Sequence, residues 1–206
     1  MIERVVTSGT FTLDGQTFEV DNNVWLVGDA DEVLVIDAAH DAGPILDAVG
    51  GRRVVAILAT HGHNDHINAA AAVADAAGAP ILLHPGDREL WGQVYDDREP
   101  DGVLADGDVV TAGGHRLRVL HTPGHTPGGV CLHDEDAGVV FSADTLFNGG
   151  PGATGRSFSD FPTIIDSIRA KLLVLEAATV VHTGHGDSTT IGAEAPHLEE
   201  WIARGH

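Results

Sequence analysis

Short apolar runs alternate with amphipathic segments along most of the chain. The runs are rich in Val, Leu and Ile and are bounded by Gly, Asp or Pro, which is typical of β-strands. At least eight are present, at residues 23–28, 32–38, 54–60, 80–84, 116–121, 129–133, 138–144 and 178–184. Apolar residues that recur every three or four positions predict helices at residues 43–51, 67–78, 161–178 and 194–205. Ser159 or Asp160 is the expected N-cap of the third helix, and Gly78 and Gly205 lie where helices should end.

The order of these elements predicts an α/β fold with mixed β-sheets. Several strands precede each helix, so strict β-α-β alternation is absent, and helices on the outer faces of mixed sheets fit the pattern better. No linker rich in Pro, Ser or charge interrupts the chain. With 206 residues, 43% of them hydrophobic, the chain is long enough to bury a large core. We therefore expect a single domain over residues 1–206, built from two similar halves that divide near residue 110.

The charge of the chain narrows its possible partners. Lys and Arg number 11 against 31 Asp and Glu, a formal net charge of −20. Nucleic acids and anionic membranes bind clustered Lys and Arg, so we expect neither as a partner. The N-terminus has no basic segment followed by an apolar stretch, and no apolar window is long enough to span a membrane. These features predict a soluble, cytoplasmic protein.

Two features that could carry other chemistry have simpler interpretations. Cys131 is the single cysteine, which excludes a disulfide within the chain and fits a reducing compartment. Its apolar surroundings predict a small buried strand residue rather than a nucleophile. The loop at residues 149–160 is rich in glycine, but it has neither a Walker lysine nor a G-x-G-x-x-G register, so phosphate binding is not expected.

Histidine and aspartate residues collect at the ends of four apolar runs. The segment "THGHNDH" directly follows the run at 54–60 and crowds four titratable side chains into six positions. Such groups would perturb one another's titration unless a cation lies among them. Further candidates follow later runs, where a sheet fixes a side chain and a loop leaves it open to substrate. The full set of candidate metal ligands is His61, His63, Asp65, His66, His125, Asp144 and His185.

These motifs resemble those of a known family. H-x-H-x-D-H, then T-P-G-H-T-P-G, A-D-T-L-F, G-H-G and "TTIGAE" follow one another in the order seen in the metallo-β-lactamase superfamily, specifically its glyoxalase II-like (hydroxyacylglutathione hydrolase-like) branch. The resemblance covers nearly the whole chain and implies a four-layer αββα sandwich of two mixed β-sheets with outer helices. It also implies a first metal held by His61, His63 and His125, a second held by Asp65, His66 and His185, and Asp144 as the bridge between them.

The donor set indicates which metals and which reaction to expect. Imidazole and carboxylate without a cysteine suit two divalent ions, best Zn, with Fe or Mn as alternatives. A water that bridges two such ions loses its proton near neutral pH, so a bridging hydroxide would attack a thioester or ester carbonyl. We therefore expect a dinuclear metallohydrolase of the glyoxalase II-like type that cleaves an S-acylated small thiol. In this hypothesis Asp65, His66 and Asp144 have catalytic as well as metal-binding roles.

Other functions remain open from the motifs. A persulfide dioxygenase would use one iron, bound through residues that match His61, His125 and Asp144. A lactonase would use two metals on a cyclic ester, and a purely structural role for the metals is a further alternative. The chain also departs from the related enzymes, because "GATG" at residues 152–155 replaces G-R-T-D and Thr183 replaces the proline before G-H-G.

We expect mycothiol rather than glutathione as the thiol carrier, and the alternative is a permissive thioesterase that recognises only the acyl group. Glutathione carries two carboxylates, but the chain has few cations, and Arg156 is the one cation in the loop at residues 149–160. The scarcity of lysine beside abundant Ala, Gly, Val and Asp is typical of a high-GC, actinobacterial genome, a lineage associated with mycothiol. Neutral side chains that could hold the sugar groups of that thiol are Asn148, Thr154, Ser157, Tyr95 and Trp91.

The remaining histidines are expected to be ordinary surface or core residues. Among them, His84 is the best candidate for a further metal ligand, because it lies at the end of a predicted strand. The others are His40, His115, His121, His133, His182, His197 and His206. Asp37 ends another apolar run, where it could either form a strand-end turn or hydrogen bond to a ligand histidine.

Overall fold

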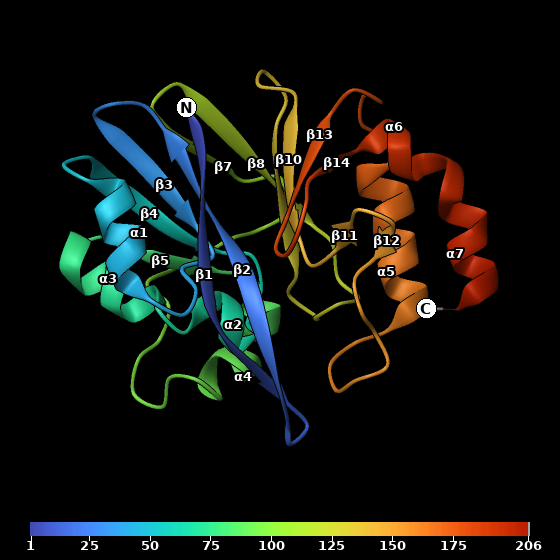
Figure 1. Ribbon diagram of the computed structural model, residues 1–206, viewed down its shortest axis with the longest axis horizontal. Coiled ribbons are helices and arrows are strands. Elements are labelled where there is room, and N and C mark those ends of the chain that lie inside the picture. The colour runs from blue at the N-terminus through green and yellow to red at the C-terminus, as the bar shows by residue number, and fades with distance from the viewer. Residues whose placement is uncertain (206) are drawn as a thin grey trace.

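The computed structural model describes residues 1–205 and contains two mixed six-stranded sheets (Figure 1). In spatial order, the first sheet contains β1 (Ile2–Leu13), β2 (Gln16–Gly28), β3 (Glu32–Ile36), β4 (Arg53–Ala59), β5 (Ile81–Leu83) and β6 (Gly102–Val103). The second sheet contains β14 (Thr189–Thr190), β13 (Val180–Thr183), β10 (Val139–Ala143), β9 (Val130–Asp134), β8 (His115–His121) and β7 (Val109–Ala112). A separate short hairpin joins β11 (Leu146–Phe147) to β12 (Gly150–Pro151). In the first sheet β3 to β6 pair in parallel, and in the second only β10 and β13 do.

Helices cover the outer face of each sheet, which gives the expected four-layer α/β/β/α sandwich (Figure 1). Beside the first sheet lie α1 (Ala42–Val49), α2 (Asn64–Ile67), α3 (Ala70–Ala77), the 3₁₀ turn η1 (Pro85–Asp87) and α4 (Arg88–Gly92). Beside the second lie α5 (Phe161–Ser167), the π-helical turn η2 (Ile168–Leu172), α6 (Ile191–Glu194), η3 (Ala195–His197) and α7 (Leu198–Arg204). No helix within residues 1–205 is long and apolar enough to cross a membrane.

Three buried layers explain why the central strands are continuous apolar runs. Along β2, Val24 and Leu26 pack toward the helices α1 and α3, whereas Trp25 and Val27 pack between the two sheets. A third cluster, which includes Cys131, lies between the second sheet and its helices. Both faces of these strands are therefore buried, so alternation with polar residues is absent. The prediction that Cys131 is a buried strand residue is confirmed.

All eight predicted strands are present, and the cap residues expected for three of the helices are confirmed. Asp160 is the N-cap of α5, and its side chain accepts a hydrogen bond from the backbone of Thr163. Gly78 and Gly205 end α3 and α7 in the left-handed conformation, with φ of 64° and 79°. Residues with a side chain rarely adopt this conformation, so glycine suits both positions.

Other predictions of the elements were incomplete or wrong. The helix expected at 161–178 ends as α-helix at Ser167, continues through η2 and stops at Leu172, although Leu173 and Leu175 beyond it still pack against the same core cluster. The helix expected at 67–78 begins only at Ala70, as α3, and the separate one-turn helix α2 precedes it at Asn64–Ile67. Strands β1, β6, β7, β11, β12 and β14 and helix α4 were not predicted. In β1 the inward positions are mostly intermediate in exposure and alternate with Thr, Ser and Glu, so no compact apolar run marks it.

Candidate metal centre

The seven predicted ligands converge where strands of both sheets end. His61, His63, Asp65 and His66 follow β4, and the one-turn helix α2 carries the last two of them on its buried side. The other three leave the second sheet: His125 follows β8, Asp144 directly follows β10, and His185 follows β13. Residues far apart in the sequence are thus brought to one place at the junction of the two sheets. All seven are buried or partly buried.

His61, His63 and His125 form the first group. The Nδ1 atom of His63 lies 3.1 Å from Nε2 of His61 and 3.0 Å from Nε2 of His125. The Nδ1–H of His125 donates to the carbonyl of Ala153 at 2.8 Å, because a carbonyl oxygen can only accept. In the neutral ring, Nε2 of His125 is then an acceptor that directs its lone pair at the other two rings.

Asp65, His66 and His185 form the second group. The Nε2 atoms of His66 and His185 lie 3.2 Å apart, and the Oδ2 atom of Asp65 lies 3.4 Å from the Nε2 atom of His185. The Nδ1–H of His185 donates to the carbonyl of Asp21 at 2.8 Å, and the Nδ1–H of His66 donates to the carboxylate of Asp37 at 2.9 Å. Two neutral rings would therefore oppose lone pair to lone pair across 3.2 Å.

Asp144 lies between the two groups. Its Oδ1 is 3.3 Å from Nε2 of His66, and its Oδ2 is 3.4 Å from Nε2 of His185 and 3.6 Å from Nε2 of His125. The Oδ1 atom is buried and has no hydrogen-bond partner among residues 1–205. A carboxylate in this position faces both sets of imidazole nitrogens at once, as the resemblance implied for a bridging ligand.

Asp37 satisfies both of the roles considered for it. Its φ of 56° makes it a strand-end turn residue. Its Oδ2 accepts hydrogen bonds from Nδ1 of His66 at 2.9 Å and from the hydroxyl of Thr60 at 2.7 Å, and its Oδ1 accepts from the backbone N–H of Thr60 at 2.7 Å. These bonds orient the ring of His66 and fix its tautomer, as the partners of metal-bound histidines do.

The electrostatics of the two groups differ. Burial lowers the pKa of His63 to about 3, with a further contribution from the charge of His125, and burial also lowers the pKa of His61 well below its usual value. Burial acts in the same direction on His185, but the Asp144 and Asp65 carboxylates outweigh it and raise its pKa to about 10. His61 and His63 are therefore neutral imidazoles, and the second group lies in a negative field that stabilises positive charge.

This arrangement fits divalent cations. The converging atoms are imidazole lone pairs and carboxylate oxygens, and a buried oxygen of Asp144 lacks a donor. Hydrogen bonds among acceptors cannot satisfy such a set, whereas a cation satisfies several of them at once. Nitrogen and oxygen donors without thiolate match metals of borderline hardness. The donor atoms of each group lie within 4.8 Å of one another, and so do those of a third combination, Asp37, His61 and His66.

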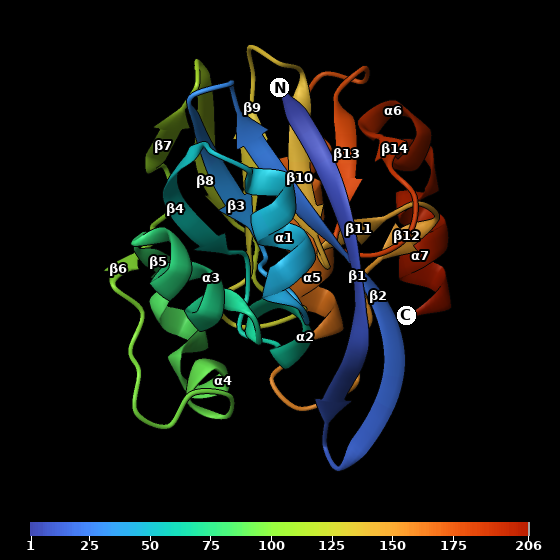
Figure 2. The same ribbon diagram turned by 60° about the vertical axis from the view of Figure 1, so that its left-hand side comes forward.

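A pocket of about 370 Å³ opens over the cluster. Its floor includes five of the seven predicted ligands: His63, Asp65, His125, Asp144 and His185. The apolar part of its wall is made by Phe11, Leu13, Phe18, Val20 and Phe147. Most of that wall belongs to the hairpin of β1 and β2, which extends beyond the rest of the first sheet (Figure 2). The ring of Phe11 packs edge-on against that of His63, with centroids 5.1 Å apart.

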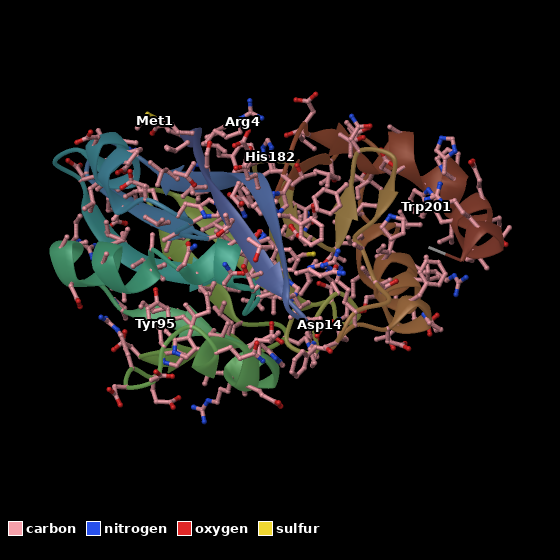
Figure 3. The ribbon with its side chains drawn as sticks, turned by 60° about the horizontal axis from the view of Figure 1, so that its bottom comes forward. Met1, Arg4, Asp14, Tyr95, His182 and Trp201 are labelled. Atoms are coloured by element: carbon pink, nitrogen blue, oxygen red, sulfur yellow. The ribbon has the colours of Figure 1, made fainter. Side chains whose placement is uncertain are left out.

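Two of the residues considered for the thiol carrier lie elsewhere. Trp91 is buried in the core of the first sheet and donates its Nε1–H to the carbonyl of Arg98, so it cannot pack on a substrate sugar. Tyr95 packs on the same core, donates its hydroxyl to the carbonyl of Ile67, and lies well apart from Asp14 at the hairpin tip (Figure 3). Ser157 does line the pocket, whereas Thr154 and Asn148 are not among its lining residues. Trp and Tyr side chains are amphipathic and can lie either in a ligand pocket or in a core. In this protein both side chains pack in the core of the first sheet.

The other histidines lie outside the ligand cluster. His84 stacks on His121, with ring centroids 4.1 Å apart, and its Nδ1 accepts from the backbone of Gly86. His40 contacts the cluster indirectly, because it hydrogen bonds to Asn22, whose amide donates to Asp65 at 3.1 Å. His206 lies outside the described residues.

Asp87 is a site residue that was not predicted. It is fully buried, and its carboxylate accepts hydrogen bonds from the backbone of Gly62 at 2.8 Å, the hydroxyl of Thr126 at 2.7 Å and the backbone of Gly128 at 2.5 Å. It therefore joins the loop of His61 and His63 to the loop of His125. An acidic residue in the polar segment "HPGDREL" carries no local signal of this role.

Comparisons with known proteins agree with the fold and the cluster. The sandwich and its His/Asp donors define a protein of the metallohydrolase type, and a family model described as "Metallo-beta-lactamase superfamily" matches residues 18–185. The chain belongs to the metallo-β-lactamase superfamily, whose members are metal-dependent hydrolases. Hydroxyacylglutathione hydrolase GloC of Haemophilus influenzae is 32% identical over 181 residues, which are 81% of this chain and 85% of the relative.

Solved structures are similar over most of the chain. The BLEG-1 B3 metallo-beta-lactamase gives a TM-score of 0.79 at 29% identity and covers 93% of this chain and 98% of its own. TTHA1623 in a di-iron-bound form gives a TM-score of 0.74 at 33% identity and covers 85% of this chain and 93% of its own.

Proposed function

We propose that this protein is a metal-dependent hydrolase that cleaves the thioester of an S-acylated small thiol. The observation that carries the proposal is the position of Asp144, whose two oxygens face both imidazole groups at the floor of an apolar pocket. The likeness to a hydroxyacylglutathione hydrolase supports this reaction class.

Two divalent ions, best Zn and alternatively Fe or Mn, would be held by the two groups. His61, His63 and His125 would hold the first, and Asp65, His66 and His185 the second, with Asp144 shared between them. When bound, such ions supply a deprotonated water as nucleophile and a Lewis acid for the substrate carbonyl. The similar protein TTHA1623 has been solved in a di-iron-bound form, which supports a two-metal site and keeps iron as an alternative metal.

The chain's own residues hold the ligands in place. The carboxylate of Asp37 and the carbonyls of Asp21 and Ala153 each accept an Nδ1–H from a histidine, which keeps the opposite ring nitrogen free to bind. Because these acceptors are backbone groups or a buried carboxylate, the rings lose little orientation freedom when a metal binds. The apolar wall, which includes Phe11 and Phe147, excludes water from the acyl group.

A cysteine nucleophile is not consistent with this site. Cys131 is fully buried in the third core cluster, and burial raises the pKa of its thiol to about 11. At neutral pH it is therefore a protonated, inaccessible group.

The deciding experiment combines metal analysis with two assays. Protein purified without added ions is analysed for metal content, then assayed for thioester cleavage and for oxygen uptake with a persulfide. We expect two metal ions per chain and thioester cleavage. One iron per chain with oxygen uptake would instead indicate a persulfide dioxygenase, and cleavage of lactones alone would indicate a lactonase.

The thiol carrier is tested separately. Arg156 is the one Lys or Arg side chain among the pocket-lining residues within the described chain, so two carboxylates of glutathione would be poorly compensated. We expect a higher kcat/KM for a given acyl group on mycothiol than for the same group on glutathione. Equal or better turnover of the glutathione thioester would contradict this preference without affecting the reaction class.

A further inference from the structure

One wall of the pocket carries a cation whose hydrogen-bonding capacity is not used. Arg156 is half-buried, and its Nη1 atom is buried without a hydrogen-bond partner among residues 1–205. The guanidinium carbon lies 4.7 Å from the ring centroid of Phe18 and 5.7 Å from that of Phe11. The two rings attract the cation, but they offer no acceptor for its N–H groups.

The loop around Arg156 is fixed at several points. The hydroxyl of Ser159 accepts from the backbone N–H of Arg156 at 3.1 Å and donates to its carbonyl at 2.7 Å. The backbone of Ser157 donates to Asp14 at 3.1 Å, which ties the loop to the tip of the hairpin. The carbonyl of Ala153, earlier in the loop, accepts from a ring of the metal centre at 2.8 Å. The loop therefore positions Arg156 relative to the metal centre.

The nearby carboxylate of Asp14 does not satisfy the buried Nη1. The pKa of Asp14 is lowered mainly by the hydrogen bonds from Ser157 and only to a small extent by the charge of Arg156. Asp14 is exposed at the hairpin tip, and its Oδ2 already accepts the Ser157 bond. Asp14 therefore leaves Nη1 without an acceptor, and the Arg156 side chain lines the pocket.

Phe11 contacts both Arg156 and the metal centre. The centroid of its ring lies 5.7 Å from the guanidinium carbon of Arg156 and 5.1 Å from the centroid of the His63 ring. Both Arg156 and His63 line the same pocket, together with Leu13 and Phe147. The pocket thus presents the metal centre, an apolar middle and the cation of Arg156 to a ligand.

We infer that Arg156 binds a carboxylate at the distal end of the substrate's acyl chain, so that the pocket selects thioesters of dicarboxylic acids with a short apolar spacer. A carboxylate offers only acceptors and matches the flat fork of a guanidinium. The net charge of −20 repels anions from most of the surface, which makes this one cation the local site for an anion. The inference rests on the proposed function, because it names the substrate class of the same pocket.

The test compares two thioesters of the neutral thiol N-acetylcysteamine. One carries a glutaryl group, and the other carries the same chain with a terminal carboxamide. Arg156→Gln should lower kcat/KM for the glutaryl thioester by about 10- to 100-fold, the effect of losing a charged hydrogen bond, and should change the carboxamide by less than about threefold. Arg156→Lys should recover part of the loss. Arg169→Gln is the matched control, because Arg169 pairs with Asp166 on the surface at 3.2 Å.

A binding measurement separates this inference from the proposed function. Titration calorimetry with metal-free protein uses a thioether analogue that carries the same terminal carboxylate and cannot be hydrolysed. Weaker binding to Arg156→Gln by about 10-fold or more, with no such change for the amide analogue, supports the inference even if no thioester is cleaved. Equal losses for the carboxylate and carboxamide compounds would show that Arg156 only supports the hairpin, and would overturn the inference.

Discussion

Replacement of Asp87 by asparagine should destabilise the protein and weaken its metal centre together. The carboxylate of Asp87 is fully buried and accepts hydrogen bonds from Gly62, Thr126 and Gly128. The backbones also approach closely, because a Cβ added to Gly128 would lie 2.6 Å from the backbone nitrogen of Asp87. No other side chain can therefore move in to replace the lost acceptor.

The size of the effect follows from the number of donors. The substituted asparagine keeps one acceptor oxygen and places an NH₂ group where the second oxygen was, so at least one glycine N–H or the Thr126 hydroxyl faces another donor. An unsatisfied buried donor costs about 1–3 kcal/mol, and the remaining bonds lose their charge assistance. Burial raises the pKa of Asp87, although these hydrogen bonds act in the opposite direction, which shows that the buried charge itself is unfavourable. Removal of that charge therefore offsets part of the stability that the lost hydrogen bonds cost. We expect a net destabilisation of about 2–3 kcal/mol, a large share of the about 5–15 kcal/mol typical of a domain.

The assay is urea unfolding of metal-free protein, because bound metal would add its own stabilisation. Metal content after dialysis against Zn²⁺ is measured in parallel, and we expect the first ion to be lost preferentially, since Asp87 joins the loops that carry its three histidines. Asp108→Asn is the matched control, because Asp108 is exposed and accepts one backbone hydrogen bond, from Ala105 at 2.8 Å. If Asp87→Asn unfolds within about 0.5 kcal/mol of the wild type and keeps full metal content, the assigned role of Asp87 is wrong.

Three further predictions address the metal centre and the pH dependence of stability. His125→Ala should lower metal content and turnover together, whereas Cys131→Ser should leave both nearly intact; equal losses in folded, metal-loaded variants would argue against metal-dependent chemistry. Asp144→Asn should reduce occupancy below two metals per chain by elemental analysis, and full occupancy would remove Asp144 from the bridge. Burial, with the charge of Arg4, lowers the pKa of His182 from 6.5 to about 4. Its stabilising contribution is therefore present above pH 6.5 and is lost as pH falls through 4. After allowance for solvent screening, the wild type should lose about 1–2 kcal/mol more than His182→Gln between pH 7 and pH 4 in urea unfolding, and identical pH profiles would contradict this.

Local patterns in the sequence predicted mixed sheets with outer helices and marked the residues that converge at the candidate metal centre, whereas the four-layer order came from the resemblance to the family. Strands buried on both faces are continuous apolar runs, and caps such as Asp160 and Gly78 act within one helical turn, so both features are visible in short segments. The candidate ligands are also visible in short segments, because His61 to His66 lie together and His125, Asp144 and His185 each follow a strand. Side chains at strand ends converge wherever the sheets meet, so their positions in the sequence already implied one site.

Contacts between distant segments decided the rest of the site. The hairpin that forms the pocket wall has a polar outer side. Its Phe11 and Phe18 rings contact the guanidinium of Arg156, which lies more than a hundred residues away in the sequence, so their role could not be predicted locally. In the sequence, Asp87 cannot be distinguished from a surface aspartate. Its role depends on the fold, which places the backbone N–H of Gly128 within hydrogen-bond distance of its carboxylate. Trp91 could have packed on a ligand or in the core, and the choice depended on neighbours that no local pattern specifies. Burial and hydrogen-bond partners are properties of the assembled chain, because a side chain's surroundings come mostly from residues that are remote in the sequence.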